Sequence, residues 1–189
     1  MKLQSLIVSL AAIACTAVPV QLSTPAPSAQ TRTPGPSATA VTVDDATWGA
    51  LAARPLRLPT VAAGGQCPVS GTRAIPGTAP GAGDGPIYPV GGRPLEVTGL
   101  GNKVLFVAAP EYRGVALIRG QRVDGPGTMR FNNGQASELR FPVNTGVISG
   151  HTSLGWRDMP STIAVDKPGC YAYQIDGVTF TTVVMVEAK

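Results

Sequence analysis

The sequence has few of the residues that build metal and catalytic centres. Its 189 residues include one histidine, His151, three cysteines and only 14% charged residues. A blue-copper site requires two histidines beside its cysteine, and structural zinc sites require paired cysteine or histidine ligands. Neither kind of site can be assembled from this composition, so we expect no metal and no other cofactor.

Nucleotide and nucleic-acid signals are missing as well. Gly81, Gly83 and Gly85 lie in a turn-rich stretch, without the third glycine of a dinucleotide-binding loop or the Gly-Lys-Ser/Thr of a P-loop. Basic residues outnumber acidic ones by 15 to 11, but they are scattered and not interleaved with aromatic residues. Nucleic acid is therefore not an expected partner.

The histidine is the only basis for a catalytic hypothesis. Ser153, His151 and either Asp158 or Asp166 could be combined into a Ser-His-Asp triad, but the G-x-S-x-G signature is absent. We expect a protein that is not an enzyme. An extracytoplasmic hydrolase with a site near His151 is the alternative.

The first twenty residues have the features of a secretory signal peptide. A basic start precedes an apolar stretch over residues 3–14, which ends in small residues. Residues 12–15 (Ala-Ile-Ala-Cys) resemble the lipobox of bacterial lipoproteins, in which Cys15 would carry the lipid. The sequence thus predicts an exported protein, either anchored to the cell membrane through a lipid or extracellular.

Two other interpretations of this segment stay open. An ordinary signal could be cleaved further along, after Ala17 or near residues 26–28. Alternatively, residues 3–20 could remain as a membrane helix, although 18 residues with several polar side chains are short against the roughly 20 apolar residues that a span needs.

The chain after the signal divides by composition into two parts. Proline, serine, threonine and alanine dominate residues 21–43, which predicts a disordered linker that holds a domain off the membrane. A plain disordered terminus is equally consistent with this composition. Residues 44–189 have the length of a single domain, whose first part, 44–92, is rich in proline and glycine and is expected to be irregular.

One short helix is expected near the start of this domain. Residues 46–53 favour a helix with Asp44 or Asp45 as its cap, and the helix must end before Pro55. Trp48 and Leu51 should then pack on the edge of the domain.

After Gly92 the sequence favours short strands. Alternating or apolar runs are separated by turn residues, and Asp176-Gly177 is the strongest turn signal between two of them. Seven or eight strands at this spacing predict a mainly β fold, a β-sandwich or a barrel. The expected strands span 95–98, 103–108, 114–119 with a continuation at 121–123, 129–131, 138–141, 162–165, 170–175 and 178–186.

The C-terminal strands carry a resemblance to known proteins. Residues 168–177 (Pro-Gly-Cys-Tyr-Ala-Tyr-Gln-Ile-Asp-Gly) and the alternating strand after them resemble the final hairpin of immunoglobulin-like extracellular modules. Together with residues 155–157 and 67–70, they are also similar to uncharacterised exported bacterial proteins. The resemblance implies an antiparallel immunoglobulin-like β-sandwich after an irregular segment, and it implies no activity. Trp156 precedes Cys170 by 14 residues, which departs from the Cys-Trp-Cys order of antibody domains.

The cysteines predict one disulfide. With Cys15 lipidated or removed, Cys67 and Cys170 are the two that remain, and an exported protein can pair them. Two buried free thiols are the alternative.

Four aromatic and basic residues are the first candidates for a binding surface. Trp156, Arg157, Tyr171 and Tyr173 belong to the types enriched in binding hot spots. The alternative is that Trp156 and one tyrosine pack around the disulfide. The expected function is a non-catalytic binding or envelope-structural module whose partner is an envelope protein or a glycan.

Overall fold

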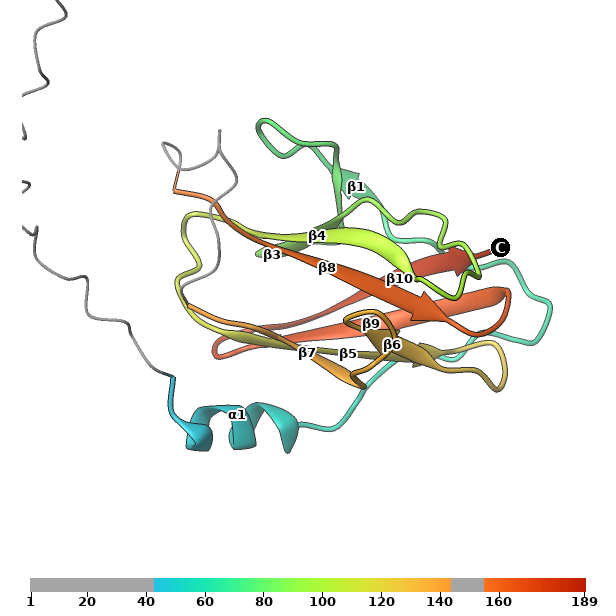
Figure 1. The fold of residues 1–189 in the computed structure, drawn as a ribbon, viewed down its shortest axis with the longest axis horizontal. Helices are drawn as coiled ribbons and strands as arrows, with labels where there is room; N and C mark the ends of the chain where they lie inside the picture. The colour runs from blue at the N-terminus through green and yellow to red at the C-terminus, as the bar shows by residue number, and fades with distance from the viewer. Residues whose placement is uncertain (1–42, 144–154) are drawn as a thin grey trace, which may run out of the picture. The chain divides into compact units, whose positions relative to one another are not determined.

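Ten β-strands and one α-helix make up the part of the chain that the computed structural model describes, residues 43–143 and 155–189. The strands form two antiparallel sheets, which lie one above the other in Figure 1. The predicted mainly β sandwich is therefore confirmed, whereas the immunoglobulin-like strand order stays a prediction. The expected signal, the linker up to residue 42, Cys15 and His151 lie outside the described residues.

The two sheets differ in size. The first sheet has the strand order β1-β2-β3-β4-β8-β6, and the second has the order β10-β9-β5-β7. The strands are β1 (Thr72–Arg73), β2 (Gly81–Ala82), β3 (Ile87–Val90), β4 (Asn102–Ala108), β5 (Ala116–Arg122), β6 (Met129–Phe131), β7 (Glu138–Phe141), β8 (Arg157–Val165), β9 (Gly169–Gly177) and β10 (Thr181–Ala188).

The core lies between the facing surfaces of the sheets. Every second residue of β9 contributes to it, because successive side chains of a strand point to opposite faces. Each large apolar side chain buried in this way contributes about 1.5–3 kcal/mol to the free energy of unfolding. The largest fully buried side chains of the core include Phe106, Phe131, Phe141, Tyr171 and Tyr173.

The predicted helix is present as α1 (Asp45–Ala52). Asp44 is its cap, since the carboxylate accepts a hydrogen bond from the backbone N–H of Thr47 at 2.9 Å. Leu51 is its only buried residue and packs on Leu117 of β5 and on Val115 just before that strand. Trp48 packs against the same cluster, so these two residues do anchor the helix to the domain, but on the outer face of the second sheet rather than at its edge.

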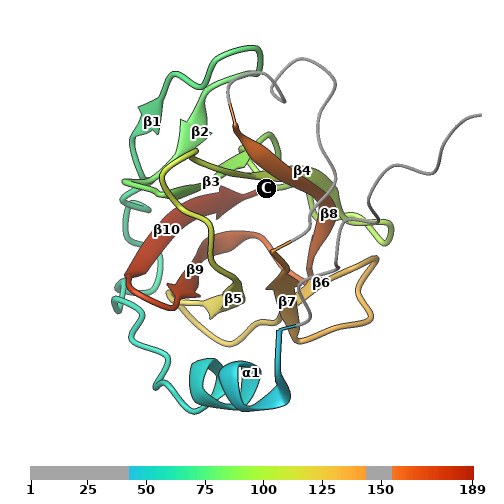
Figure 2. The ribbon, with the colours of Figure 1, turned by 90° about the vertical axis from the view of Figure 1, so that its left-hand side faces the viewer.

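The outer face of the second sheet is covered by the chain that precedes the strands. We call residues 45–70 the N-terminal strap. After α1 it runs along the β9–β10 side of the molecule toward β1 (Figure 2). The backbone N–H of Val61 donates to the carbonyl of Val123 at 3.0 Å, and that of Ser70 donates to Met185 at 3.1 Å. Residues of β9 that face away from the core are therefore buried under the strap.

Several strand boundaries differ from the sequence-based expectation. Three strands, β1 to β3, precede Gly92 in the stretch expected to be irregular. All four residues of β3 are buried, so this strand has no polar alternation from which it could be recognised. Conversely, the expected strand at 95–98 reduces to one parallel bridge between Leu95 and Ala188. Strand β8 starts at Arg157, five residues earlier than expected.

The last hairpin forms, but its turn lies elsewhere than predicted. Asp176 pairs with Thr181 inside the ladder, and the backbone N–H of Gly177 donates to the carbonyl of Phe180 at 2.9 Å. The turn is therefore made by Val178 and Thr179. The Asp-Gly signal fails here because the Asp176 carboxylate is fully buried and bound by polar side chains, which holds it in the strand.

Candidate functional site

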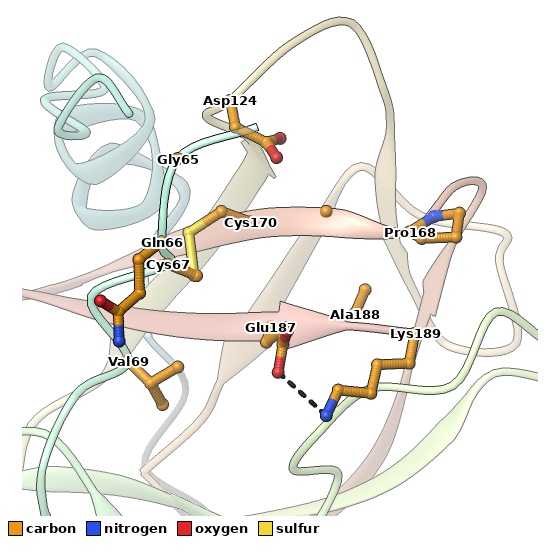
Figure 3. Close-up of a pocket in the computed structure, with 11 residues that line it drawn as sticks. Gly65, Gln66, Cys67, Val69, Asp124, Pro168, Cys170, Glu187, Ala188 and Lys189 are labelled. Atoms are coloured by element: carbon orange, nitrogen blue, oxygen red, sulfur yellow. Dashed lines mark ion pairs between the residues drawn. A yellow bond between two sulfur atoms is a disulfide. The ribbon is translucent and has the colours of Figure 1, made fainter. Parts of the chain in front are cut away.

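A polar cup lies beside the disulfide at one end of the second sheet (Figure 3). The predicted bridge is present: Cys67 of the strap is bonded to Cys170 at the start of β9, with 5.3 Å between their Cα atoms. The cup has a volume of about 610 Å³. Glu187 and Lys189, neighbours on one wall of the cup, form an ion pair at 3.2 Å.

Asp124 on the rim of the cup is also paired. Its carboxylate accepts a hydrogen bond from Arg122 at 2.6 Å, and this contact lowers the pKa of Asp124. The charges of Asp124, Glu187 and Lys189 are thus compensated within the protein. The cup offers a ligand mainly backbone groups and the amide of Gln66.

Trp156 lies on the opposite sheet from the disulfide. It is half-buried, and its ring packs at a tilt on Tyr88 with 6.3 Å between the ring centroids. Both rings belong to an apolar cluster on the outer face of the first sheet. The alternative in which Trp156 packs around the bridge is therefore wrong, since Cys170 contacts residues such as Val123, Ala172 and Met185 instead.

Arg157 connects two loops. One of its terminal nitrogens donates to the carbonyls of Pro142 and Val143, and the other donates to those of Tyr112 and Gly114, at 2.8 to 3.1 Å. Burial lowers the pKa of its guanidinium. Since its terminal N–H groups are already engaged, Arg157 holds these loops together at the start of β8.

Tyr171 and Tyr173 belong to the core. Their exposed fractions are 0% and 2%, so neither ring reaches the surface. The Tyr171 hydroxyl shares its one hydrogen between two acceptors, the Asp166 carboxylate at 3.1 Å and the carbonyl of Lys167 at 2.9 Å. Burial, with Asp166 as the next cause, raises the pKa of Tyr171 to about 12, and burial also raises that of Tyr173.

Asp158 and Asp166, the two carboxylates of the catalytic hypothesis, are both built into the framework of the sheets. Asp166 accepts a hydrogen bond from the backbone N–H of Thr128 at 2.8 Å, which lowers the pKa of Asp166. Asp158 is buried within β8, with 4% of its surface exposed. His151 and Ser153 lie outside the described residues. In the described ranges no three histidine, cysteine or acidic residues cluster as metal ligands would.

A second hollow, on the first sheet, was not anticipated from the sequence. We call it the polar hollow; it has a volume of about 480 Å³ and lies where β6 ends beside β8. The Asn-Asn-Gly sequence predicts the turn that forms one wall. The position of this turn over β8 depends on contacts between residues that are far apart in the sequence. The lining residues are Lys103, Asn132, Asn133, Pro160, Ser161 and Thr162.

The turn at this hollow is held by hydroxyl groups of β8. Thr162 donates to the side-chain oxygen of Asn133 at 3.1 Å and accepts the backbone N–H of Asn133 at 2.5 Å. Ser161 donates to the side-chain oxygen of Asn132 at 3.2 Å. Both asparagines have positive φ, 51° and 57°, a conformation that asparagine tolerates better than most residues.

Comparisons with known proteins add no relative to these observations. No protein-family model matches the chain, and neither curated proteins nor solved structures gave a match. The fold and the surfaces described above therefore carry the functional conclusion. Among the described residues, no helix is long enough to cross a membrane, since α1 has only eight residues.

Proposed function

We propose that this protein is an exported, membrane-tethered, non-catalytic binding or envelope-structural module, with an immunoglobulin-like sandwich as its folded part. The observation that carries the proposal is the Cys67–Cys170 disulfide, which fastens the strap to the second sheet. Disulfides form and persist in oxidising compartments and are rare in the cytosol. The bridge therefore agrees with the secretory signal predicted for residues 1–20.

The polar hollow supports a binding role. It is open to solvent on the outer face of the first sheet, and its lining combines amide, hydroxyl and ammonium groups with the ring of Pro160. Polar groups of this kind fix the orientation of a ligand, while an apolar surface contributes contact area. An envelope glycan or an envelope protein is the partner class that we propose.

Membrane fractionation tests the tether. Cys15→Ala should release the chain from membranes or leave its signal unprocessed, because stable anchoring requires acyl chains that contribute about 0.8 kcal/mol for each buried CH₂. The neighbouring Thr16→Ala variant is the control and should remain with the membranes. A wild-type mature chain that is soluble and begins beyond Cys15 would contradict the lipid anchor.

A thiol assay on the exported protein tests the compartment independently. Alkylation without prior reduction should leave Cys67 and Cys170 unmodified, and alkylation after reduction should modify both. If both cysteines react in protein isolated without reductant, the extracytoplasmic assignment loses its main support.

A further inference from the structure

The polar hollow presents hydrogen-bond donors in excess of acceptors. Its two asparagine side chains each use their oxygen to accept a hydroxyl of β8. Among the described residues, the amide nitrogens of Asn132 and Asn133 and the ammonium group of Lys103 have no protein acceptor. The strand ladder places Lys103 directly opposite Thr162, the residue that holds Asn133. The three donors therefore surround one space.

The charge of the hollow selects the ligand further. Lys103 is exposed, and none of the described residues that line the hollow is acidic. Two amide donors and one ammonium group favour a ligand that is rich in acceptors and negatively charged. Carboxylate and phosphate groups have these properties, and their hydrogen bonds to a charged donor are stronger than neutral ones.

An apolar surface continues the hollow along the sheet. Pro160 is exposed, and the ladder places it opposite Leu105, which is half-buried on the same outer face. Side chains paired in this way lie about 5 Å apart, so the two form one apolar step beside the donors. A sugar ring can contact both surfaces at once. Its oxygen atoms can accept hydrogen bonds from the donors, while its C–H face packs against the apolar side chains.

We infer that the polar hollow binds the acidic residues of an anionic glycan, with Lys103, Asn132 and Asn133 contacting its carboxylate or phosphate groups and Pro160 contacting a ring face. This inference rests on the proposed function and names the chemical class of the partner. It assigns no role to the cup beside the disulfide, whose charges are paired within the protein.

Calorimetric titration of the full exported chain with an oligogalacturonate tests the inference. Binding should be measurable at low salt and should weaken as salt rises, while neutral dextran should not bind. Lys103→Gln should raise the dissociation constant about tenfold, because it removes a charge-assisted hydrogen bond. The matched control Lys167→Gln makes the same charge change at an exposed site in the turn between β8 and β9, and it should leave the constant unchanged within twofold.

Asn133→Asp provides a second, sharper variant. The carboxylate retains an oxygen for Thr162 and tolerates the positive φ, but it replaces a donor by a negative charge. Binding of the oligogalacturonate should disappear, while the thermal unfolding of the variant should stay close to that of the wild type. The side-chain amide of Asn133 should also shift in nitrogen-resolved NMR spectra on titration of the wild type.

Four results would overturn the inference. They are equal binding of dextran, equal weakening by Lys167→Gln, no shift at either asparagine, and binding of inorganic phosphate without binding of the oligogalacturonate. The last result would identify a free anion as the ligand. The membrane fractionation and the thiol assay do not depend on any of these results. The proposed function can therefore stand when this inference fails.

Discussion

At the scale of single residues, Tyr171 illustrates how burial changes an ionisable group. Its ring is in the core, and its hydroxyl reaches out to Asp166 and to the carbonyl of Lys167. Burial disfavours the phenolate, and so does the neighbouring carboxylate, so the pKa of Tyr171 rises from its ordinary 10.0 to about 12.

This shift predicts a loss of stability at alkaline pH. Below pH 10 the phenol is protonated in both states, and its stabilising effect is fully present. Between about pH 10 and pH 12 the unfolded chain releases the proton first, so the free energy of unfolding should fall as pH rises. Urea unfolding at pH 8 and at pH 11 measures the fall.

Tyr171→Phe separates this effect from general alkaline weakening. The variant should lose less stability between the two pH values than the wild type, although some dependence remains because burial also raises the pKa of Tyr112 and Tyr173. An unchanged difference between pH 8 and pH 11 would show that Tyr171 does not titrate in this way.

At the scale of elements, a polar network on β5 and β9 holds the N-terminal strap. Arg119 donates to the carbonyls of Ala52 and Arg54 at 3.1 and 2.9 Å, and to Asp176 at 2.8 Å. Gln174 accepts the backbone N–H of Arg57 at 2.7 Å and donates to Asp176. The Asp176 carboxylate therefore orients both Arg119 and Gln174, the two side chains that hydrogen-bond to the strap.

Asp176→Asn should destabilise the protein by about 3 kcal/mol, because it leaves Arg119 without its counter-charge in a largely buried position. Denaturant unfolding measures this change. In this variant, the backbone amides of the strap should exchange with solvent faster than those of the sheet strands. As the matched control, Glu138→Gln breaks the exposed pair with Arg140 and should cost about 1 kcal/mol or less. Equal effects of the two variants would contradict the network.

At the scale of the whole molecule, the disulfide closes a long covalent loop. It joins residues 103 positions apart and ties the strap to the strand that begins the last hairpin. The strands β1 to β3, which follow the strap, are held in the first sheet by their own ladders. Loss of the bridge should therefore loosen the chain up to about residue 70 more than the strands beyond it.

Cys67→Ala combined with Cys170→Ala should lower the free energy of unfolding by about 2–5 kcal/mol, since the unfolded chain gains conformational freedom. Urea unfolding gives the magnitude, and hydrogen exchange gives the location. The wild type in the presence of reductant should behave like the double variant. Full stability of the reduced protein would mean that the strap is held without the bridge.

Much of the fold follows from local chemistry that can be recognised in the sequence. The alternation of 138–141 and the apolar run of 103–108 predict β7 and β4 within one residue, and the acidic cap predicts the start of α1. The pairing of Cys67 with Cys170 follows from counting the cysteines. Each of these signals lies within a few residues or in the composition, so no knowledge of the packing is needed.

Other features depend on what packs against a residue, which the sequence does not display. Asp176 looks like a turn residue, but the strap and Arg119 bury it in a strand. Tyr171 and Tyr173 look like binding residues, but their strand faces the core. The polar hollow joins β4, β8 and the turn after β6, which only the sheet order brings together. Local sequence patterns thus determined strands such as β4 and β7, whereas tertiary packing added β1 to β3 and decided which strand faces meet solvent.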